Sequence, residues 1–395
     1  MKLDSTDILV VGAGPGGSTA ARFAAESGAG CTVLEKRPEV GEPVQCAEGV
    51  SSQVLEELGL TEGKWTAKKI ENVKMISPSG VVVDMQDRVR GFNFGYVLER
   101  KVFDKHLSRM AAQSGADLKL CSKAVGMTRR DGRAVVTYEE FGELREIEAK
   151  IVIGADGVMS KVGRWAGIDT RLGPKDIESG IEYEMTNIEA GDEIEMYFGR
   201  CYAPGGYAWI FPKDSDRANV GLAVIPSMAK RPAVEYLDEF ISNPILGDRM
   251  KDGSIIEIKA GGVPVSGPLK SAVADNTMLV GDAARQVNPM TGGGISSSVT
   301  CGKIAGEVSA ELSEGGDYSA RALKPYDERW IEAIGNYHWK LLKAKDVYMK
   351  LNDDELDEIA KAFQKAKDVE FSTMGTLRSM AKTSPRLLWK LRKIL

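Results

Sequence analysis

The chain has 395 residues, of which 43 are Gly and 43% are hydrophobic, so it is long enough for two or three structural units with sizeable cores. It holds only two His, His106 and His338, and five scattered Cys without CxxC or HExxH spacing, so we expect no metal site built from these residues. The formal net charge of −5 gives no overall reason to expect nucleic-acid binding.

The N-terminal residues MKLDSTD run directly into the strand-like ILVVG, without an apolar leader segment. No apolar run approaches the roughly 20 residues that cross a bilayer. An odd number of cysteines fits a reducing interior. We therefore expect a cytoplasmic protein, either soluble or attached peripherally to the inner face of the cell membrane.

A glycine-rich segment of the form GxGxxG follows a short buried strand at residues 7–11 and precedes a helix-like run. In this context Gly12 permits a tight turn, Gly14 lets the backbone approach a pyrophosphate, and Gly17 allows close helix packing. Pro15 and Gly16 complete the loop. The next strand ends in Glu35, which is placed to bind a ribose hydroxyl and favours a free 2′-hydroxyl, as in FAD or NAD.

Two further strands end in characteristic turns, GADG at residues 154–157 and GDAA at residues 281–284, and the second leads into NPMTGGGI at residues 288–295. An L-x-R segment opens a helix at residues 98–100. Together with the first loop, this set resembles the FAD-dependent hydroxylase and reductase superfamily that includes p-hydroxybenzoate hydroxylase. The resemblance covers nearly all of residues 1–325.

The resemblance implies FAD as the cofactor and assigns residues to its parts. Asp282 would accept hydrogen bonds near the ribityl chain and pyrophosphate, while Gly294 and Ile295 would present helix-start N–H groups to the flavin pyrimidine edge. Arg100 would reach the phosphates, and the backbone of Ala124 would lie against the adenine. Taken singly, Asp282 could instead be a helix cap and Arg100 a solvated helix-start residue.

The region between the FAD segments alternates polar and apolar residues and predicts an antiparallel sheet covered by a helix near residues 233–242. Within it, the segment GYAWIFPK at residues 206–213 places three aromatic side chains, Tyr207, Trp209 and Phe211, on one face of a strand. They are predicted to form an apolar wall for the substrate; the alternative is an ordinary aromatic core.

The motif G-Y-x-W-x-F-P-K resembles the geranylgeranyl reductase branch of the superfamily, and PVQCAEG at residues 43–49 resembles the cysteine-containing loop of that branch. This implies flavin contacts at Cys46, Ala47 and Gly49. The loop reads CAEG where many relatives carry CGG, which weakens the inference to side-chain roles.

The resemblance implies a prenyl substrate with isolated trisubstituted alkenes. Such an alkene has no carbonyl to stabilise hydride addition, so its reduction needs protonation, and protonation develops positive charge on the tertiary carbon. Aromatic faces stabilise a cation by about 0.5 to 2 kcal/mol each, which favours Tyr207 and Trp209. Cys46 is a hypothetical proton donor; a water beside the flavin or a simple packing role for the thiol are alternatives.

The C-terminal segment is helix-like, and residues 371–395 contain six Lys or Arg and no acid beside several Leu and Trp389. Such a basic amphipathic helix is suited to an anionic membrane surface, although a helix docked on the protein would read the same way. The absence of coiled-coil heptads favours a monomer.

We predict an α/β fold with α+β elements in three parts. They are a discontinuous Rossmann-like FAD-binding domain at residues 1–70, 98–175 and 270–325, an antiparallel-sheet substrate domain at 71–97 and 176–269, and a helical region at 326–395.

The predicted function is FAD-dependent saturation of the C=C bonds of geranylgeranyl chains, most like that of the archaeal digeranylgeranylglycerophospholipid reductases. Its partners would be an isoprenoid lipid and an external electron donor, either nicotinamide, ferredoxin or reduced deazaflavin, since no second Rossmann fingerprint occurs. An FAD-dependent aromatic monooxygenase or halogenase, or a non-enzymatic prenyl-binding protein, are the alternatives.

Overall fold

The computed structural model describes residues 4–85 and 95–365, which divide into two compact units. Within these residues the first unit comprises 4–44, 100–172 and 264–340, and the second comprises 45–85, 95–99, 173–263 and 341–365. The division differs from the three predicted parts in two ways: residues 45–70 belong to the second unit, and the predicted helical region is no unit of its own, since residues 326–340 belong to the first unit and 341–365 to the second. The first difference has a clear cause. The reason is β-pairing: β3 (Gly49–Val50) and β4 (Thr66–Ile70) both pair with β7 (Gly95–Leu98) in a small three-stranded sheet.

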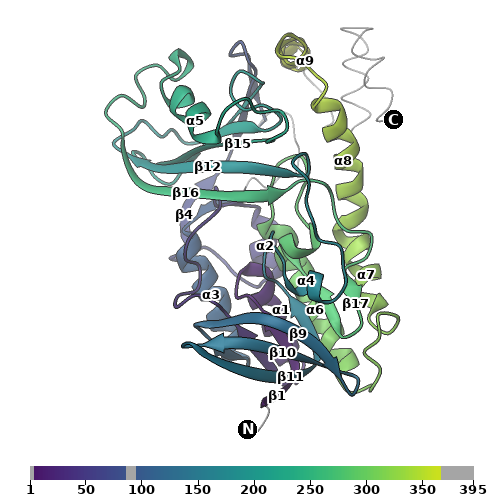
Figure 1. Cartoon of the computed structure of the whole chain (residues 1–395). Coiled ribbons are helices and arrows are strands. Elements are labelled where there is room, and N and C mark those ends of the chain that lie inside the picture. The colour runs from purple at the N-terminus through teal and green to yellow at the C-terminus, as the bar shows by residue number, and fades with distance from the viewer. Residues whose placement is uncertain (1–3, 86–94, 366–395) are drawn as a thin grey trace. The chain divides into compact units, whose positions relative to one another are not determined.

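The first unit is built on an eight-stranded sheet with a parallel centre (Figure 1). Its path is β17-β18-β11-β1-β2-β8, and β10 pairs with β11 and β9 in an antiparallel ribbon. Ile8, Leu9 and Val10 are fully buried, as the continuous apolar run ILVV predicts for a central parallel strand. The strands are β1 (Asp4–Val11), β2 (Cys31–Leu34), β8 (Asp117–Lys119), β9 (Ser122–Arg130), β10 (Arg133–Glu140), β11 (Glu143–Gly154), β17 (Val273–Ala274) and β18 (Thr277–Leu279).

Two helices, α1 and α6, pack closely in the first unit because glycines remove side chains from their contact. A Cβ at Gly302 would lie 2.4 Å from the carbonyl oxygen of Gly16, and a Cβ at Gly306 would lie 2.4 Å from that of Ala20. The helical elements of this unit are α1 (Pro15–Glu26), α3 (Arg100–Gln113), α4 (Val162–Trp165), the 3-10 turn η2 (Gly281–Ala284), α6 (Ile295–Ser313), α7 (Lys324–Trp330), the π-turn η3 (Ile331–Gly335) and the start of α8 (Asn336–Tyr348).

The second unit contains a seven-stranded sheet in the order β16-β12-β15-β14-β13-β5-β6. The sheet is antiparallel as predicted, with one correction: β5 runs parallel to β13. The two strands are about 120 residues apart in the chain and are not joined by a hairpin, so their relative direction is not fixed by a tight turn. The strands are β5 (Val73–Ile76), β6 (Val82–Asp84), β12 (Ile177–Thr186), β13 (Ile194–Phe198), β14 (Tyr207–Pro212), β15 (Ala218–Val224) and β16 (Ser254–Pro264).

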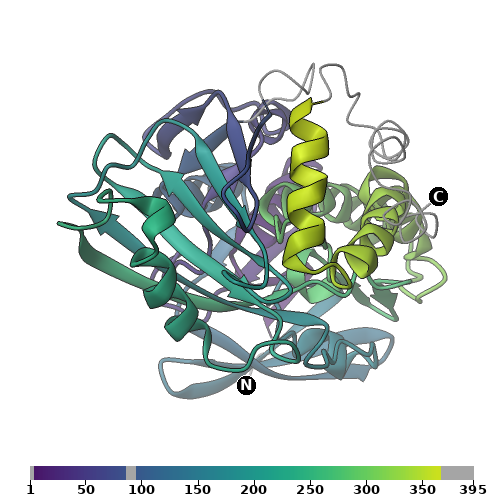
Figure 2. The ribbon, with the colours of Figure 1, turned by 90° about the horizontal axis from the view of Figure 1, so that it is seen from above.

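One face of this sheet is covered by α5 (Ala233–Ile241), which lies across β12 and β15 and buries Tyr236, Leu237 and Phe240 (Figure 2). The helix occupies the predicted position. The unit also contains α2 (Ser52–Glu57), the 3-10 turn η1 (Pro244–Leu246), the end of α8 and α9 (Asp353–Lys365). The Asp357 carboxylate on α9 accepts hydrogen bonds from Ser77 and Ser79, which fixes the helix beside β6.

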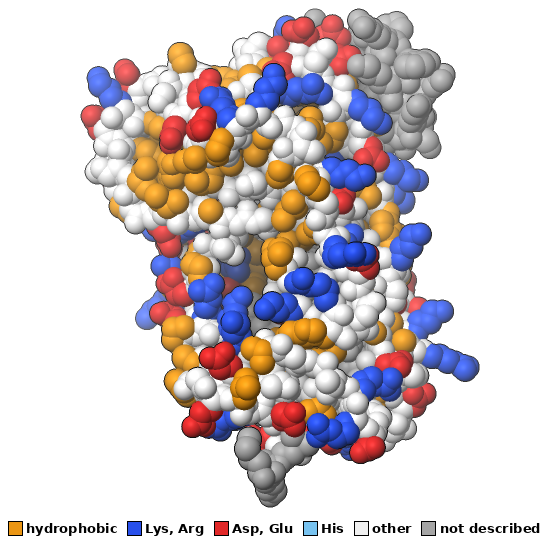
Figure 3. Space-filling model, viewed as in Figure 1, with side chains coloured by type: hydrophobic (Ala, Val, Ile, Leu, Met, Phe, Trp, Pro, Cys, Tyr) orange, Lys and Arg blue, Asp and Glu red, His pale blue; other side chains and the backbone are white. Residues whose placement is uncertain are grey.

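Hydrophobic side chains gather on part of the surface of the second unit (Figure 3). The edge strand β16 contributes three exposed isoleucines, Ile255, Ile256 and Ile258, of which the last is 64% exposed. Within residues 4–85 and 95–365, no helix is both long and apolar enough to cross a membrane. The basic segment 371–395 lies outside the described residues, so its predicted amphipathic helix stays a prediction.

Replacing Gly306 by Ala should destabilise the first unit by about 1 to 3 kcal/mol, because the added methyl group would push α6 away from the α1 backbone. Chemical denaturation monitored by circular dichroism measures the change. Gly315→Ala is the matched control, since its Cβ would meet only an atom at 3.5 Å. Equal stability of both variants would show that close contact between these helices does not limit stability.

Candidate active site

The glycine loop of the first unit has the backbone geometry of a nucleotide cradle. Gly12 has a φ of +104°, and a Cβ there would lie 2.4 Å from the carbonyl oxygen of Ala155. A Cβ at Gly17 would lie only 1.9 Å from the carbonyl oxygen of Gly12, so neither position accepts a side chain. Gly14 faces open space, as required where a phosphate approaches the backbone.

The start of α1 is equipped to bind an anion. No side chain caps the helix, no acid occurs in its first turn, and Pro15 stands at its beginning. The first N–H groups of a helix have no intrahelical acceptor, so they remain available to a phosphate. Glu35, at the end of β2, accepts hydrogen bonds at 2.9 Å from the backbone N–H groups of Ala13 and Arg37. Its carboxylate is thereby held beside the loop, where the sequence predicts a ribose.

The other predicted cofactor residues of the first unit are distributed over four elements. Asp282 lies in η2. Burial raises its pKa to about 6, although the positive charge of Arg100 acts to lower it. Arg100 begins α3 and forms a bidentate ion pair with Asp104 at 2.8 Å. Gly294 and Ile295 form the uncapped start of α6, and Ala124 lies on β9. Their contacts with a cofactor stay predictions.

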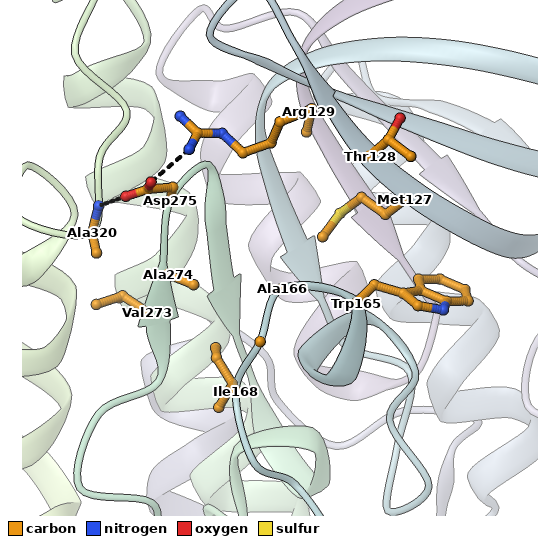
Figure 4. Close-up of a pocket in the computed structure, with 12 residues that line it drawn as sticks. Met127, Thr128, Arg129, Trp165, Ala166, Ile168, Val273, Ala274, Asp275 and Ala320 are labelled. Carbon is orange, nitrogen blue, oxygen red and sulfur yellow. Dashed lines mark hydrogen bonds and ion pairs between the residues drawn. The ribbon is translucent and has the colours of Figure 1, made fainter.

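A separate cavity of about 490 Å³ opens in the first unit among β9, α4 and β17 (Figure 4). Its side chains include Met127, Trp165 and Ile168. Arg129 forms an ion pair with Asp275 at 2.6 Å at its edge. None of the predicted cofactor residues lines this cavity, so it is distinct from the glycine loop.

In the second unit the three predicted aromatic side chains form a row along β14. The ring centroids of Tyr207 and Trp209 are 5.7 Å apart, and those of Trp209 and Phe211 are 6.4 Å apart, each pair inclined by 61°. Tyr207 and Trp209 are both about nine-tenths buried. The aromatic row therefore exists as the period-two pattern predicts.

Sequence reasoning missed two rings that extend the row. Phe198 on β13 lies 5.5 Å from Tyr207, and Tyr348 at the end of α8 lies 6.2 Å from Phe198. The Tyr348 hydroxyl donates a hydrogen bond of 2.7 Å to the Gly206 carbonyl oxygen. No local signal indicates these contacts, because they depend on strand order and on a helix about 140 residues further along the chain.

The predicted cysteine loop packs against the aromatic row. Ala47 contacts the cluster formed by Tyr207, Trp209 and Ala223, and a Cβ at Gly49 would lie 2.8 Å from the Phe211 ring. The thiol of Cys46 accepts a hydrogen bond from the backbone N–H of Glu48 at 3.2 Å. The structure thus brings together two of the sequence-predicted groups, Cys46–Gly49 and the aromatic residues.

A buried charged cluster holds this loop in place. Glu48 has a φ of +73°, which costs a non-glycine residue about 1 kcal/mol, yet its side chain is fixed on three sides. Its carboxylate lies 2.7 Å from the Lys213 ammonium and 3.1 Å from that of Lys259, and it accepts a 2.6 Å hydrogen bond from Asn219. Asn219 also donates to the carbonyl oxygen of Ala47 at 3.2 Å.

Further carboxylates on β12 complete the charged cluster. Glu184 lies 3.1 Å from Lys213 and 3.2 Å from Lys259, and Glu182 lies 3.4 Å from Lys259. Burial alone would raise the pKa values of Glu48 and Glu184. The positive charges of the two lysines have the larger effect and hold the pKa of each carboxyl group below its usual range. Burial dominates at Glu182 and raises its pKa to about 8. Glu178, also buried, is paired with Lys345 at 2.5 Å.

The first unit has the glycine loop, acidic ribose position and second uncapped helix of a nucleotide-binding fold, and these residues fit a flavin nucleotide. The sheet of the second unit has an aromatic wall beside a cysteine loop. Together these features indicate a flavoprotein, and they confirm the predicted fold class.

Comparisons with known proteins identify the family. The geranylgeranyl reductase catalytic domain matches residues 176–263, and an NAD(P)-binding Rossmann-like domain matches residues 10–51. Digeranylgeranylglycerophospholipid reductase of Methanothrix thermoacetophila is 43% identical, with 98% of this chain and 99% of that protein covered. Digeranylgeranylglycerophospholipid reductase 1 of Methanothermobacter thermautotrophicus is 45% identical, with 98% of each covered.

Solved structures show the same fold. A geranylgeranyl bacteriochlorophyll reductase-like protein from Thermoplasma acidophilum is 35% identical, with a TM-score of 0.91 and complete coverage of both chains. The myxobacterial FAD-dependent chondrochloren halogenase is similar in fold, with 19% identity, a TM-score of 0.72, and coverage of 99% of this chain and 95% of that one. The chain belongs to the digeranylgeranylglycerophospholipid reductase family, which confirms the resemblance drawn from its motifs.

Replacing Lys213 by Met should destabilise the second unit by about 3 to 5 kcal/mol, because it leaves Glu48, Glu99 and Glu184 with less compensating charge in a buried place. Urea denaturation measures the effect. Lys74→Met is the control, since Lys74 and Glu193 are each about a third exposed and such pairs contribute at most about 1 kcal/mol. A Lys213→Met variant as stable as this control would contradict the role of the cluster.

Proposed function

We propose that this protein saturates the C=C bonds of geranylgeranyl chains in an FAD-dependent reaction, with digeranylgeranylglycerophospholipids as its substrates. The observation that carries the proposal is the aromatic row, which lies inside the region that matches the reductase catalytic domain and packs against the Cys46–Gly49 loop. The names of the full-length relatives support the same substrate class.

FAD would be held by both backbone and side chains of this chain, and when bound in its reduced form it supplies the hydride. The residues proposed to bind it are Gly12, Gly14, Pro15, Gly16, Gly17, Glu35, Cys46, Ala47, Gly49, Arg100, Ala124, Asp282, Gly294 and Ile295. The open face of Gly14 and the carboxylate of Glu35 beside it support a pyrophosphate and a ribose at the loop.

The aromatic row would bind the prenyl chain and stabilise charge. A prenyl chain offers only apolar surface, which the apolar faces of Tyr207, Trp209 and Phe211 match. Protonation of an alkene carbon develops positive charge on its tertiary neighbour, and an aromatic face stabilises such charge electrostatically. The rings of this row would therefore both position the chain and lower the barrier to its protonation.

Cys46 is our candidate to hold the proton that the alkene receives. Its thiol lies in the loop next to the aromatic row, and the N–H group of Glu48 donates a hydrogen bond to the sulfur. Such a bond would stabilise the thiolate that remains after proton transfer. The reaction also requires an external electron donor, for which nicotinamide, ferredoxin and reduced deazaflavin are the proposed classes.

A lipid substrate favours peripheral contact of a cytoplasmic monomer with the inner face of the membrane. The basic segment 371–395 and the exposed isoleucines of β16 support this proposal. Both features suit a surface with anionic headgroups over an apolar interior.

The purified protein, with dithionite-reduced FAD under strict exclusion of oxygen, should convert digeranylgeranylglycerophospholipid to products that have gained two hydrogen atoms per reduced double bond. Mass spectrometry of the extracted lipid measures this gain. A protein that turns over only with oxygen, and adds oxygen or halogen to an aromatic substrate, would instead be a monooxygenase or halogenase. Tight lipid binding without turnover would indicate a prenyl-binding protein.

Cys46→Ala should lower the rate of lipid reduction in the same anaerobic assay by about 100-fold, the lower end of what a positioned acid contributes. Cys201→Ala is the matched control, because Cys201 is an exposed residue and is not among the residues proposed to bind FAD or substrate. Wild-type turnover by Cys46→Ala would exclude this thiol as the proton donor.

A further inference from the structure

Strand β12 presents a row of carboxylates on one face of the second-unit sheet. Glu178, Glu182 and Glu184 are separated by even numbers of residues, so their side chains point to the same side of the strand. All three are buried. Burying a carboxyl group is costly unless it has partners, so each must be explained by what it contacts.

Glu182 contacts the aromatic row directly. Its Oε2 accepts a hydrogen bond of 2.7 Å from the indole Nε1 of Trp209. The two residues are on different strands, β12 and β14, with β15 between them. An indole N–H buried in an apolar cluster needs such an acceptor, because leaving it unpaired costs about 1 to 3 kcal/mol.

The contact is possible because of a glycine in the intervening strand. Gly221 of β15 pairs in register with Glu182 on one side and with Trp209 on the other. A Cβ at Gly221 would lie 2.6 Å from Cζ2 and 2.7 Å from Cε2 of Trp209. The indole therefore lies across the backbone of β15, where any side chain would displace it.

Glu182 is in turn fixed by the charged cluster. Its second oxygen, Oε1, lies 3.4 Å from the Lys259 ammonium and makes no hydrogen bond within the described residues. Lys259 also contacts Glu48, Glu184 and the side-chain oxygen of Asn219. The same ammonium group thus fixes the carboxyl group that holds Trp209 and the side chain that anchors the cysteine loop.

The charge balance of the cluster fits a neutral Glu182. Five of its side chains are at most 8% exposed, namely the two lysines and three glutamates Lys213, Lys259, Glu48, Glu182 and Glu184. Among these five side chains the glutamates exceed the lysines by one, and the partly exposed Arg217 and Glu99, which pair with Glu184 and Lys213, add one charge of each sign. One negative charge therefore remains in excess unless one carboxyl group carries a proton. A neutral carboxyl oxygen still accepts the indole hydrogen bond, which is a property that Gln shares.

We infer that Glu182 is a positioning residue for the reduction: by holding the indole of Trp209 across Gly221, it sets the orientation of the ring that faces the prenyl chain. The inference rests on the proposed function, in which Trp209 contacts substrate. Ring orientation matters because both close packing and cation stabilisation depend on which part of the aromatic system is presented. Without the hydrogen bond, the indole would keep its place in the row but lose its fixed plane.

A double-mutant cycle tests this coupling with the full-length holoenzyme in the anaerobic lipid assay. Glu182→Leu and Trp209→Phe should each lower kcat/KM by about tenfold, since each removes the same hydrogen bond. The double variant should be no worse than Trp209→Phe alone. Glu182→Gln should stay within about threefold of wild type. Effects that multiply in the double variant, or a fully active Glu182→Leu, would overturn the inference.

A second readout does not depend on turnover. The chain has six Trp, so the indole resonances of a ¹⁵N-labelled sample can be counted, and that of Trp209 is the one missing in Trp209→Phe. It should move upfield in Glu182→Leu and in Gly221→Ala but keep its position in Glu182→Gln. An unchanged resonance in Glu182→Leu would overturn the inference even if the protein is an active reductase. A shifted resonance in a protein without reductase activity would instead contradict the proposed function.

The matched control is a second buried pair of the same kind. In the first unit Trp330 donates a 2.8 Å hydrogen bond to the Asp327 carboxylate. Asp327→Leu, which removes the acceptor as Glu182→Leu does, should shift the Trp330 resonance and leave both the Trp209 resonance and kcat/KM of the folded protein unchanged. A comparable loss of kcat/KM in this variant would show that breaking any buried indole bond impairs the enzyme, which would overturn a specific role for Glu182.

Discussion

The second unit depends on the requirement that buried charges be paired. Lys213 and Lys259 have almost no solvent contact, and in a medium of low dielectric constant an unpaired ammonium is far more costly than a paired one. Their partners come from a loop at residue 48 and from β12. The pairs can form only when these distant segments meet in one arrangement, so the cluster fixes the cysteine loop and the strands of the sheet relative to each other.

The first unit meets a different constraint, which is close approach of backbones. Gly12 and Gly17 leave no room for a side chain, and Gly302 and Gly306 let α6 lie against α1. The helix-start N–H groups and the open face of Gly14 remain for a ligand. A flavin nucleotide would thus be recognised largely through the backbone, which explains the concentration of glycine in these turns. The second unit, in contrast, relies on specific side chains.

Backbone recognition in the first unit and side-chain contacts in the second both suit the proposed chemistry. In that proposal the redox step belongs to the flavin, and the chain would supply binding, orientation and a proton without metal ligands or histidine pairs. An alkene without polar groups offers only its shape and its capacity to become a cation. Aromatic rings can pack against that shape and can also stabilise the cation. Both effects depend on how the rings are oriented. The hydrogen bond from Trp209 to Glu182 connects that orientation to the charged cluster below the row.

Short-range patterns in the sequence determined the glycine loop with its strand and helix, the position of Glu35 and the aromatic row, because each depends only on local spacing and period. They also predicted the fold class and the family, which the comparisons confirm, while the cofactor contacts of individual residues stay predictions. The tertiary structure alone decided that Phe198 and Tyr348 extend the row, that residues 45–70 join the second unit and that β5 runs parallel to β13. It also revealed that Glu48, in the loop whose CAEG departs from the usual CGG, anchors Cys46, and that Glu182 reaches Trp209 across Gly221. These features depend on pairing between strands and side chains far apart in the chain, for which local sequence carries no signal.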